Sequence, residues 1–438
     1  MRKRLFKTVL VDGNNDDWDH ALNRVTSEDQ TTKVALHNLD LSQINYGPWL
    51  LAHPQKVWHS IEICDCSHMI AGLGQLLSMK MERLHILSSR TTLDRNLGEL
   101  LERGLVESPV LKYMSLAHLQ WTTLGMKALS RGLARTNKLR ELNLSYTIFA
   151  GEDVDIIVQS LASGLEQNTS LRCLRLNTCR LQDRHVAALG QALVAHGHIR
   201  QLYLGGNSCH FDGMTALAAL LEQVNLETLG LSHQRQESFI GEENASDKAS
   251  SDYRPPIFIM ANALPYSNLE VLHLASNNLR DDDIDQLAEF FQDSWLKLLD
   301  LNNNQIGDRG VSILTLHFPP QLKKLWLSDN PITPVGANAL LNKLATTHDE
   351  LTDLRIPTYS GYRINNTMMD LQSQLNFYGR LNYGGRKLLK KSNLPRGLWS
   401  AVLERVNRLE WKRDATDVEI ARVQILYCLL HGPVLFER

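Results

Sequence analysis

The chain lacks the features that mark a secreted or membrane-spanning protein. Its 438 residues include six cysteines without a paired spacing, so no disulfide framework is indicated and a reducing compartment is expected. No apolar run approaches the roughly 18 residues that suggest a membrane-spanning helix. The apolar stretch after Met1 is interrupted by Lys7 and ends at Asp12, which is too short for a signal peptide. We therefore expect a cytoplasmic protein, and a nuclear location stays open.

Charge excess and catalytic motifs are also missing. The net charge of −2 argues against general binding to polyanions. The chain has no G-x-x-x-x-G-K-[ST], H-E-x-x-H or G-x-S-x-G motif. Cys64, Cys66 and His68 are residue types that bind zinc, but no second ligand pair lies nearby in the sequence. We expect no enzyme activity, no cofactor and no metal site.

A leucine-rich motif recurs along most of the chain. Its frame is L-x-x-L-x-L-x-x-N/C-x-L, which corresponds to one β-strand and the turn after it. The clearest copy runs from Leu269 to Leu279. Good copies begin at Leu111, Leu139, Leu171, Ile199, Leu226, Leu269, Leu296, Leu322 and Leu351. Weaker copies begin at Leu36, Trp58 and Met81. The pattern predicts twelve repeats of one structural unit.

The spacing between copies predicts a helix after each strand. Most steps lie near 28 residues, and the remainder of each copy has apolar residues at the helical period, as in Gly125–Leu133, Val186–Leu193 and Val335–Leu344. Asp308 and Thr333 stand where helix N-caps are expected. Strands about 4.8 Å apart cannot keep pace with helices about 10 Å wide, so the stack must curve. We predict an α/β horseshoe solenoid with parallel strands on the concave face and helices on the convex face.

The repeat with its long helical half resembles the ribonuclease-inhibitor-like leucine-rich repeat proteins, over roughly residues 105–357. That group also includes Ran GTPase-activating proteins and sensor regions of immune receptors. Six residues occupy the N/C position of the motif and are expected to bond the backbone of the turn. They are Cys66, Cys179, Asn207, Asn277, Asn304 and Asn330.

Three regions are expected along the chain. Residues 1–104 hold an N-terminal cap and degenerate repeats, and residues 105–358 hold the regular repeats. One step of 43 residues contains a polar inserted loop at 234–256, which is either a tolerated surface loop or a regulatory one. Residues 359–438 form a basic helical extension.

The extension at 359–438 differs from the repeats in charge and pattern. It holds 13 Lys/Arg against 7 Asp/Glu, a net charge of +6. Helical patterns occur at 366–377, 398–409 and 418–430. Part of this extension resembles that of leucine-rich repeat proteins from diatoms and related algae. We expect it to cap the last repeat, and docking of a second partner is the alternative.

Side chains that point away from the core are the candidates for binding. In each motif, positions 3, 5 and 7 face the concave side because side chains alternate along a strand. Aromatic residues and arginine often anchor protein interfaces, and Trp326 is the strongest single candidate; packing against neighbouring side chains is its alternative role. The predicted protein-binding residues are Tyr113, Asn143, Arg175, Tyr203, His273, Asp300, Trp326 and Arg355.

These observations favour a monomeric, non-catalytic interaction scaffold with an unidentified protein partner. They indicate no small-molecule substrate and make no strong case for nucleic acid or membrane. Two alternatives follow from the resemblance and the repeats: a GTPase-activating protein of the Ran-activator type, and a substrate adaptor of a ubiquitin ligase.

Overall fold

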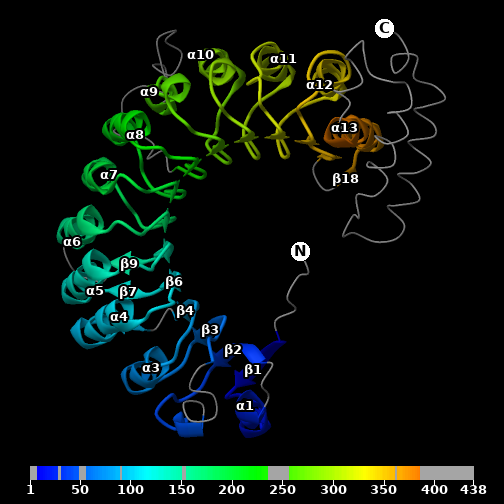
Figure 1. The fold of residues 1–438 in the computed structure, drawn as a ribbon. Coiled ribbons are helices and arrows are strands. Elements are labelled where there is room, and N and C mark those ends of the chain that lie inside the picture. Colours follow the sequence, from blue (N-terminus) through cyan, green and yellow to red (C-terminus); the bar gives the residue numbers. More distant parts are fainter. Residues whose placement is uncertain are drawn as a thin grey trace, which may run out of the picture. The chain divides into compact units, whose positions relative to one another are not determined.

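The structure is a computed structural model that describes residues 7–27, 31–48, 56–88, 91–149, 154–234, 256–360 and 363–384. It forms two compact units. The first contains Met1–Leu229 and Gln234–Ser238, and the second contains Gly230–His233 and Phe239–Arg438. Within each unit, helices lie on one side of the strands and the other face of the strands is open (Figure 1).

The first unit repeats a strand and a helix. Its strands are β1 (Lys7–Asp12), β2 (Thr31–His37), β3 (Ser60–Cys64), β4 (Arg83–Leu87), β6 (Tyr113–Ser115), β8 (Glu141–Asn143), β10 (Cys173–Arg175) and β11 (Gln201–Tyr203), and they pair in this order. β12 (Thr228–Gly230) lies where the two units divide. The helices are α1 (Trp18–Ser27), α3 (Met69–Leu77), α4 (Arg95–Glu107), α5 (Thr123–Arg135), α6 (Val154–Gln167), α7 (Asp183–His196) and α8 (Phe211–Gln223). The short strands β5 (Thr92–Leu93), β7 (Gln120–Trp121) and β9 (Ile148–Phe149) form a second, parallel sheet.

The second unit continues the same alternation. Its strands β13 (Val271–His273), β14 (Leu298–Asp300), β15 (Lys324–Trp326) and β16 (Asp353–Arg355) pair in order, and β17 (Tyr359–Ser360) pairs with β18 (Arg363–Ile364). The helical elements are α9 (Ile257–Ala261), η2 (Leu264–Tyr266), α10 (Asp281–Gln292), α11 (Asp308–Leu316), α12 (Pro334–Thr346) and α13 (Asn366–Gly384).

Parallel register stacks the motif leucines on one another. Leu272, Leu299, Leu325 and Leu354 pair in sequence across β13 to β16, and all four side chains are buried. Alternation along each strand then turns positions 3 and 5 to the face opposite the helices. Both units are therefore α/β leucine-rich repeat solenoids, as the spacing predicted.

Asparagines at the N/C position satisfy the turn that follows each strand. The Asn207 side-chain amide donates to the carbonyls of Leu176 and Leu204, both at 2.8 Å. Its Oδ1 accepts from the backbone amides of Cys179 at 3.0 Å and Leu181 at 3.1 Å. These bonds reach backbone groups that have left the strand ladder and need partners in the core. The Leu204 carbonyl also accepts from the Gln234 side-chain amide at 2.9 Å.

The other five N/C residues lie in equivalent turns. Asn304 and Asn330 donate to backbone carbonyls of their own and the preceding turn. Asn277 donates to the Leu231 carbonyl at 2.8 Å. The thiols of Cys66 and Cys179 donate to the carbonyls of Leu36 and Leu144, each at 3.3 Å.

A second bond network joins the start of one helix to the start of the next. Asp308, the first residue of α11, accepts from the backbone amides of Thr333 at 2.8 Å and Gly336 at 3.0 Å at the start of α12. Asp183 accepts from the amide of His210 at 2.6 Å, and Asp281 accepts from that of Gly307 at 2.6 Å. Three helices therefore receive a carboxylate at their N-terminus from the preceding repeat, where the helix dipole favours negative charge.

The structure corrects the first repeats and one cap. Leu36 does not begin a motif: it pairs with Ile63, so it holds the third apolar position of its strand. The prediction also missed β1, whose residues were interpreted only as a short, interrupted apolar stretch. Asp308 is not an N-cap, because Gly307 holds that position, whereas Thr333 is confirmed as one and accepts from the Val335 amide at 3.2 Å.

Helix α13 packs against α12 and β16 at the end of the second unit. Its Leu371 and Leu375 are buried, and its Gln372 donates to the Leu354 carbonyl at 2.7 Å and accepts from the Ile356 amide at 2.8 Å. The helix covers the predicted helix at 366–377 and is longer. The predicted helices at 398–409 and 418–430 lie outside the described residues, as does the inserted loop apart from its ends, Gln234 and Pro256.

Candidate functional site

The open face is the set of side chains at positions 3 and 5 of the strand motifs, on the side of each sheet away from the helices. All eight predicted binding residues lie on it. Register brings Tyr113, Asn143, Arg175 and Tyr203 together in the first unit, over β6 to β11. It brings His273, Asp300, Trp326 and Arg355 together in the second unit, over β13 to β16.

An arginine stacked on an aromatic ring is the main feature of the open face in the first unit. The Arg175 guanidinium lies 4.1 Å from the centroid of the Tyr203 ring. Its Nε donates to Oε1 of Glu141 at 2.9 Å. Ring and carboxylate hold the guanidinium in place, which reduces the rotamer entropy that a partner would have to remove on binding. Asn143 lies beside this stack and donates to the Ser115 hydroxyl at 3.2 Å.

The second unit repeats this arrangement with tryptophan. The Arg355 guanidinium lies 4.5 Å from the Trp326 ring centroid, and its Nη2 donates to Asp353 Oδ2 at 3.1 Å. The same carboxylate oxygen accepts from the Trp326 indole Nε1 at 3.1 Å. Trp326 is therefore packed by its neighbours and only half-buried, so part of its ring stays exposed on the open face. On the neighbouring strands, His273 Nδ1 lies 3.1 Å from Asp300 Oδ2.

A third stack lies where the prediction named no residue. The Arg83 guanidinium lies 4.0 Å from the centroid of the Tyr113 ring, and the His85 ring lies 4.7 Å from the same centroid. Burial, with the nearby Arg83 charge, lowers the pKa of His85 and favours its neutral form. Among the described residues Arg83 has no ion-pair partner, in contrast to Arg175 and Arg355.

Arg83 and His85 could have been found from the sequence. The weak copy that begins at Met81 puts Arg83 at position 3 and His85 at position 5. Only the strong copies from Leu111 onward contributed candidate residues. Glu141 and Asp353 were also missed as site residues, because carboxylates on a strand carry no signal until their partner arginines are known.

A hollow of about 440 Å³ opens on the same face beside Arg83. Two small side chains, Ala35 and Ser60, contribute to its lining, together with the charged side chains of Lys33, Glu62 and Arg83. Glu62 lies 3.5 Å from His37 Nε2. The hollow is therefore polar and rimmed by two permanent cations and one carboxylate that already has a neighbour.

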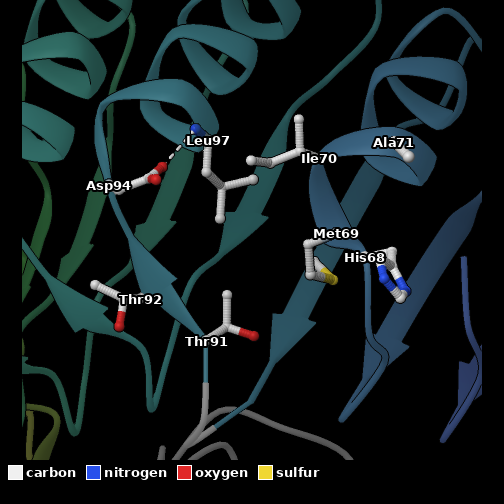
Figure 2. Close-up of a pocket in the computed structure, with 8 residues that line it drawn as sticks. All are labelled: His68, Met69, Ile70, Ala71, Thr91, Thr92, Asp94 and Leu97. Atoms are coloured by element: carbon white, nitrogen blue, oxygen red, sulfur yellow. Dashed lines mark hydrogen bonds between the residues drawn. The ribbon is translucent and has the colours of Figure 1, made fainter. Parts of the chain in front are cut away.

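A second hollow, of about 430 Å³, lies between the N-terminal ends of α3 and α4 (Figure 2). Ile70 and Leu97 face one another across it, and its two ionisable groups already have structural partners. Asp94 Oδ1 accepts from the Leu97 amide at 3.0 Å as a helix cap, and His68 Nδ1 lies 2.8 Å from Asp40. This hollow offers apolar contact but no acid–base pair.

The cysteines of the described chain are poor nucleophiles. Burial raises the pKa of Cys173, Cys179 and Cys209 to about 12 in each case, so these thiols stay protonated at neutral pH. Cys64 and Cys66 are also free, and burial raises the pKa of both. Within the residues that the structure covers, no three histidine, cysteine or acidic side chains are grouped to hold a metal ion.

Comparisons with known proteins agree with this architecture. The family model described as Leucine Rich repeat matches residues 267–288 and 292–314. The ribonuclease inhibitor of Mus musculus is 24% identical over 355 residues, which cover 72% of this chain and 74% of that protein. The chain has the leucine-rich repeat fold and is similar to ribonuclease inhibitor.

Solved structures that match this chain include an internalin from Listeria monocytogenes, at 16% identity and a TM-score of 0.40, covering 80% of this chain and 86% of that chain. Another is human trophoblast glycoprotein, at 16% identity and a TM-score of 0.33, covering 67% of this chain and 85% of that chain. In this leucine-rich repeat protein, no described helix is both long and apolar enough to cross a bilayer.

Proposed function

We propose that the protein is a non-catalytic scaffold that binds another protein on the open face of its strands, the concave face of the predicted horseshoe. The observation that carries this proposal is the display of arginine–aromatic stacks on that face, at Arg83, Arg175 and Arg355. Arginine, tyrosine and tryptophan are the side chains that most often dominate binding energy at protein interfaces. Held rigid by neighbouring side chains, they lose little entropy on binding.

The chemistry of the face supports binding more than catalysis. The carboxylates of Glu141 and Asp353 are paired with arginine, and Asp300 is paired with His273. The thiol of Cys173 on this face is held protonated by burial, which raises its pKa to about 12. A general acid or base needs a titrating group beside a substrate pocket, and these side chains instead hold one another in place.

The name of the mouse relative, ribonuclease inhibitor, describes a protein that acts on another protein. We extend only that mode of action to this chain. Its own partner is selected by its own open-face side chains, and we place the encounter in the cytoplasm or nucleus, where the free thiols of the described residues would persist.

The test is affinity purification of the tagged chain from its source cells, followed by measurement of affinity for the recovered partner. Trp326→Ala and Arg175→Glu are expected to weaken binding by about tenfold or more each, as interface anchors do. Trp295→Ala is the matched control, because Trp295 is 53% exposed but precedes the strand motif. Arg184→Glu, on α7 of the same repeat as Arg175, is the second control.

Equal loss in the controls would indicate general damage to the fold, and circular dichroism of each variant checks for it. A partner that binds both open-face variants as tightly as it binds the parent chain would show that the interface lies elsewhere.

A further inference from the structure

The three arginine–aromatic stacks of the open face differ in one respect. Arg175 on Tyr203 is paired with Glu141 at 2.9 Å, and Arg355 on Trp326 is paired with Asp353 at 3.1 Å. Arg83 lies at a comparable distance from the Tyr113 ring, but no carboxylate in the described part of the chain forms an ion pair with it. A guanidinium has five N–H donors and no other way to satisfy them than water or an acceptor.

The surroundings of Arg83 leave room for an acceptor beside its guanidinium. By the strand register, Ser60 lies between Lys33 on β2 and Arg83 on β4. Adjacent strands are about 4.8 Å apart, so the two cationic side chains start about 10 Å apart with a small hydroxyl side chain between them. The hollow of about 440 Å³ opens at this point, and all three residues line it.

The other charges near the hollow do not fill this role. Glu62 lies two residues after Ser60 on β3, and its Oε1 is 3.5 Å from His37 Nε2. Glu82 contacts His59 at 3.1 Å and Lys112 at 3.0 Å, and the hydrogen bond from Lys112 lowers the pKa of its carboxyl. His85 closes the side of Tyr113 with its ring. Lys33 and Arg83 thus flank the hollow. Glu62, which also lines it, lies near His37 without a hydrogen bond to its Nε2, and Glu82 is paired with His59 and Lys112.

We propose that the hollow over Ser60 binds a carboxylate of an acidic segment of the partner protein, held between Arg83 and Lys33. Arg83 donates in the way that Arg175 donates to Glu141, with the acid supplied from outside the chain. The proposal rests on the proposed function and specifies the chemistry of one part of the interface. A guanidinium already stacked on a ring can donate N–H groups to a carboxylate with little further ordering.

The experiment measures fluorescence anisotropy of a labelled glutamate-rich peptide with the full chain, against the same peptide with every glutamate replaced by glutamine. The glutamate peptide is expected to bind more tightly, and high salt is expected to weaken it. Arg83→Gln should lower its affinity by about tenfold, as expected for a charge-assisted pair. Arg184→Gln, on α7, should leave the affinity unchanged.

A glutamate introduced into the hollow tests the proposal more directly. Ser60→Glu puts a carboxylate next to Arg83, in the place proposed for the partner's acid, and is expected to exclude the peptide. Ser60→Gln has the same size without the charge and is expected to reduce affinity less. A similar loss from both would attribute the effect to size and would overturn the assignment.

Two further results would also overturn it: equal binding of the two peptides, and an Arg83→Gln variant that binds the glutamate peptide as tightly as the parent. Either can occur while Trp326→Ala still weakens binding of the purified partner. In that case the acidic-segment inference is wrong and the proposed scaffold function stands.

Discussion

Asn207 and Tyr203 lie four residues apart in one repeat, yet they belong to regions with different chemistry. Asn207 is fully buried, and its amide bonds to backbone groups of two successive turns. Tyr203 is half-buried on the open face, where it supports Arg175 by stacking. The buried turns satisfy the chain's own backbone, and the open face offers side-chain groups outward. Substitutions should therefore separate stability from binding.

The largest expected effect on stability is that of Asn207→Ala. The variant leaves two buried amides and the Leu176 carbonyl without this partner, while the Leu204 carbonyl keeps its bond from Gln234. We expect the free energy of unfolding to fall by about 3 kcal/mol or more, because each unsatisfied buried group costs about 1–3 kcal/mol. Urea unfolding followed by circular dichroism measures it.

The open-face counterpart is Asn143→Ala, which removes a bond to the Ser115 hydroxyl and one from the Ser145 amide. We expect a smaller loss, of about 1 kcal/mol, because Asn143 makes two hydrogen bonds to the buried Ser115 and Ser145, whereas Asn207 makes several to the turn backbone. If the two variants were equally destabilised, the division between buried turns and open face would not describe the energetics.

Low pH is expected to destabilise the fold through its buried histidines, by less than the Asn207→Ala substitution. Burial lowers the pKa of His196 from 6.5 to about 4, while its Nδ1 accepts from the His198 amide at 3.1 Å. The unfolded chain binds this proton more readily, so stability is complete above about pH 6.5 and declines as the pH falls toward 4. His196 alone should account for about 2 kcal/mol of loss at pH 5.

Burial also lowers the pKa of His85 and His348, which adds loss in the same direction. Unfolding free energies measured at a series of pH values give the slope, and His196→Gln should reduce it. A slope of unchanged size in that variant would mean that other groups control the acid response.

A smaller effect is expected where two repeats touch. The Gly336 amide donates to Asp308, and a Cβ added at Gly336 would lie 2.5 Å from that carboxylate oxygen. We expect Gly336→Ala to cost about 1–2 kcal/mol through overpacking. At Gly190, in the middle of α7, the nearest atom to an added Cβ is 3.6 Å away. Gly190→Ala should instead stabilise by up to about 1 kcal/mol, and thermal unfolding of the pair tests the contrast.

Much of the fold could be predicted because its signal is repeated. Leucines at fixed positions, a step near 28 residues and helical periodicity in the second half of each step together determine strand, turn and helix. Failures came where repetition was weak. Leu36 was assigned to the wrong position of its motif and β1 was missed, since the first strands contain Val and Ile in place of regularly spaced Leu. The Asp308 cap was wrong because its carboxylate bonds to the next helix, which a local pattern does not reveal.

The site was only partly predictable for a different reason. Strand alternation identified the open face and therefore Arg175, Tyr203 and Trp326. Which arginine stacks on which ring depends on register between strands about 30 residues apart in sequence. Arg83 differs from Arg175 and Arg355 because no described carboxylate forms an ion pair with it. Neither composition nor periodicity predicts which arginine has such a partner.

The aspartates at the helix starts give the array a direction. Asp281 serves the start of α11, and Asp308 serves the start of α12, so each helix depends on the repeat before it in the chain. If α12 opens, Asp308 is left facing water, which solvates a carboxylate well. If α11 opens, α12 loses the anion at its positive end. Local melting in the second unit should therefore spread more easily toward the C-terminus than toward the N-terminus, and hydrogen exchange would record that asymmetry as a gradient of protection.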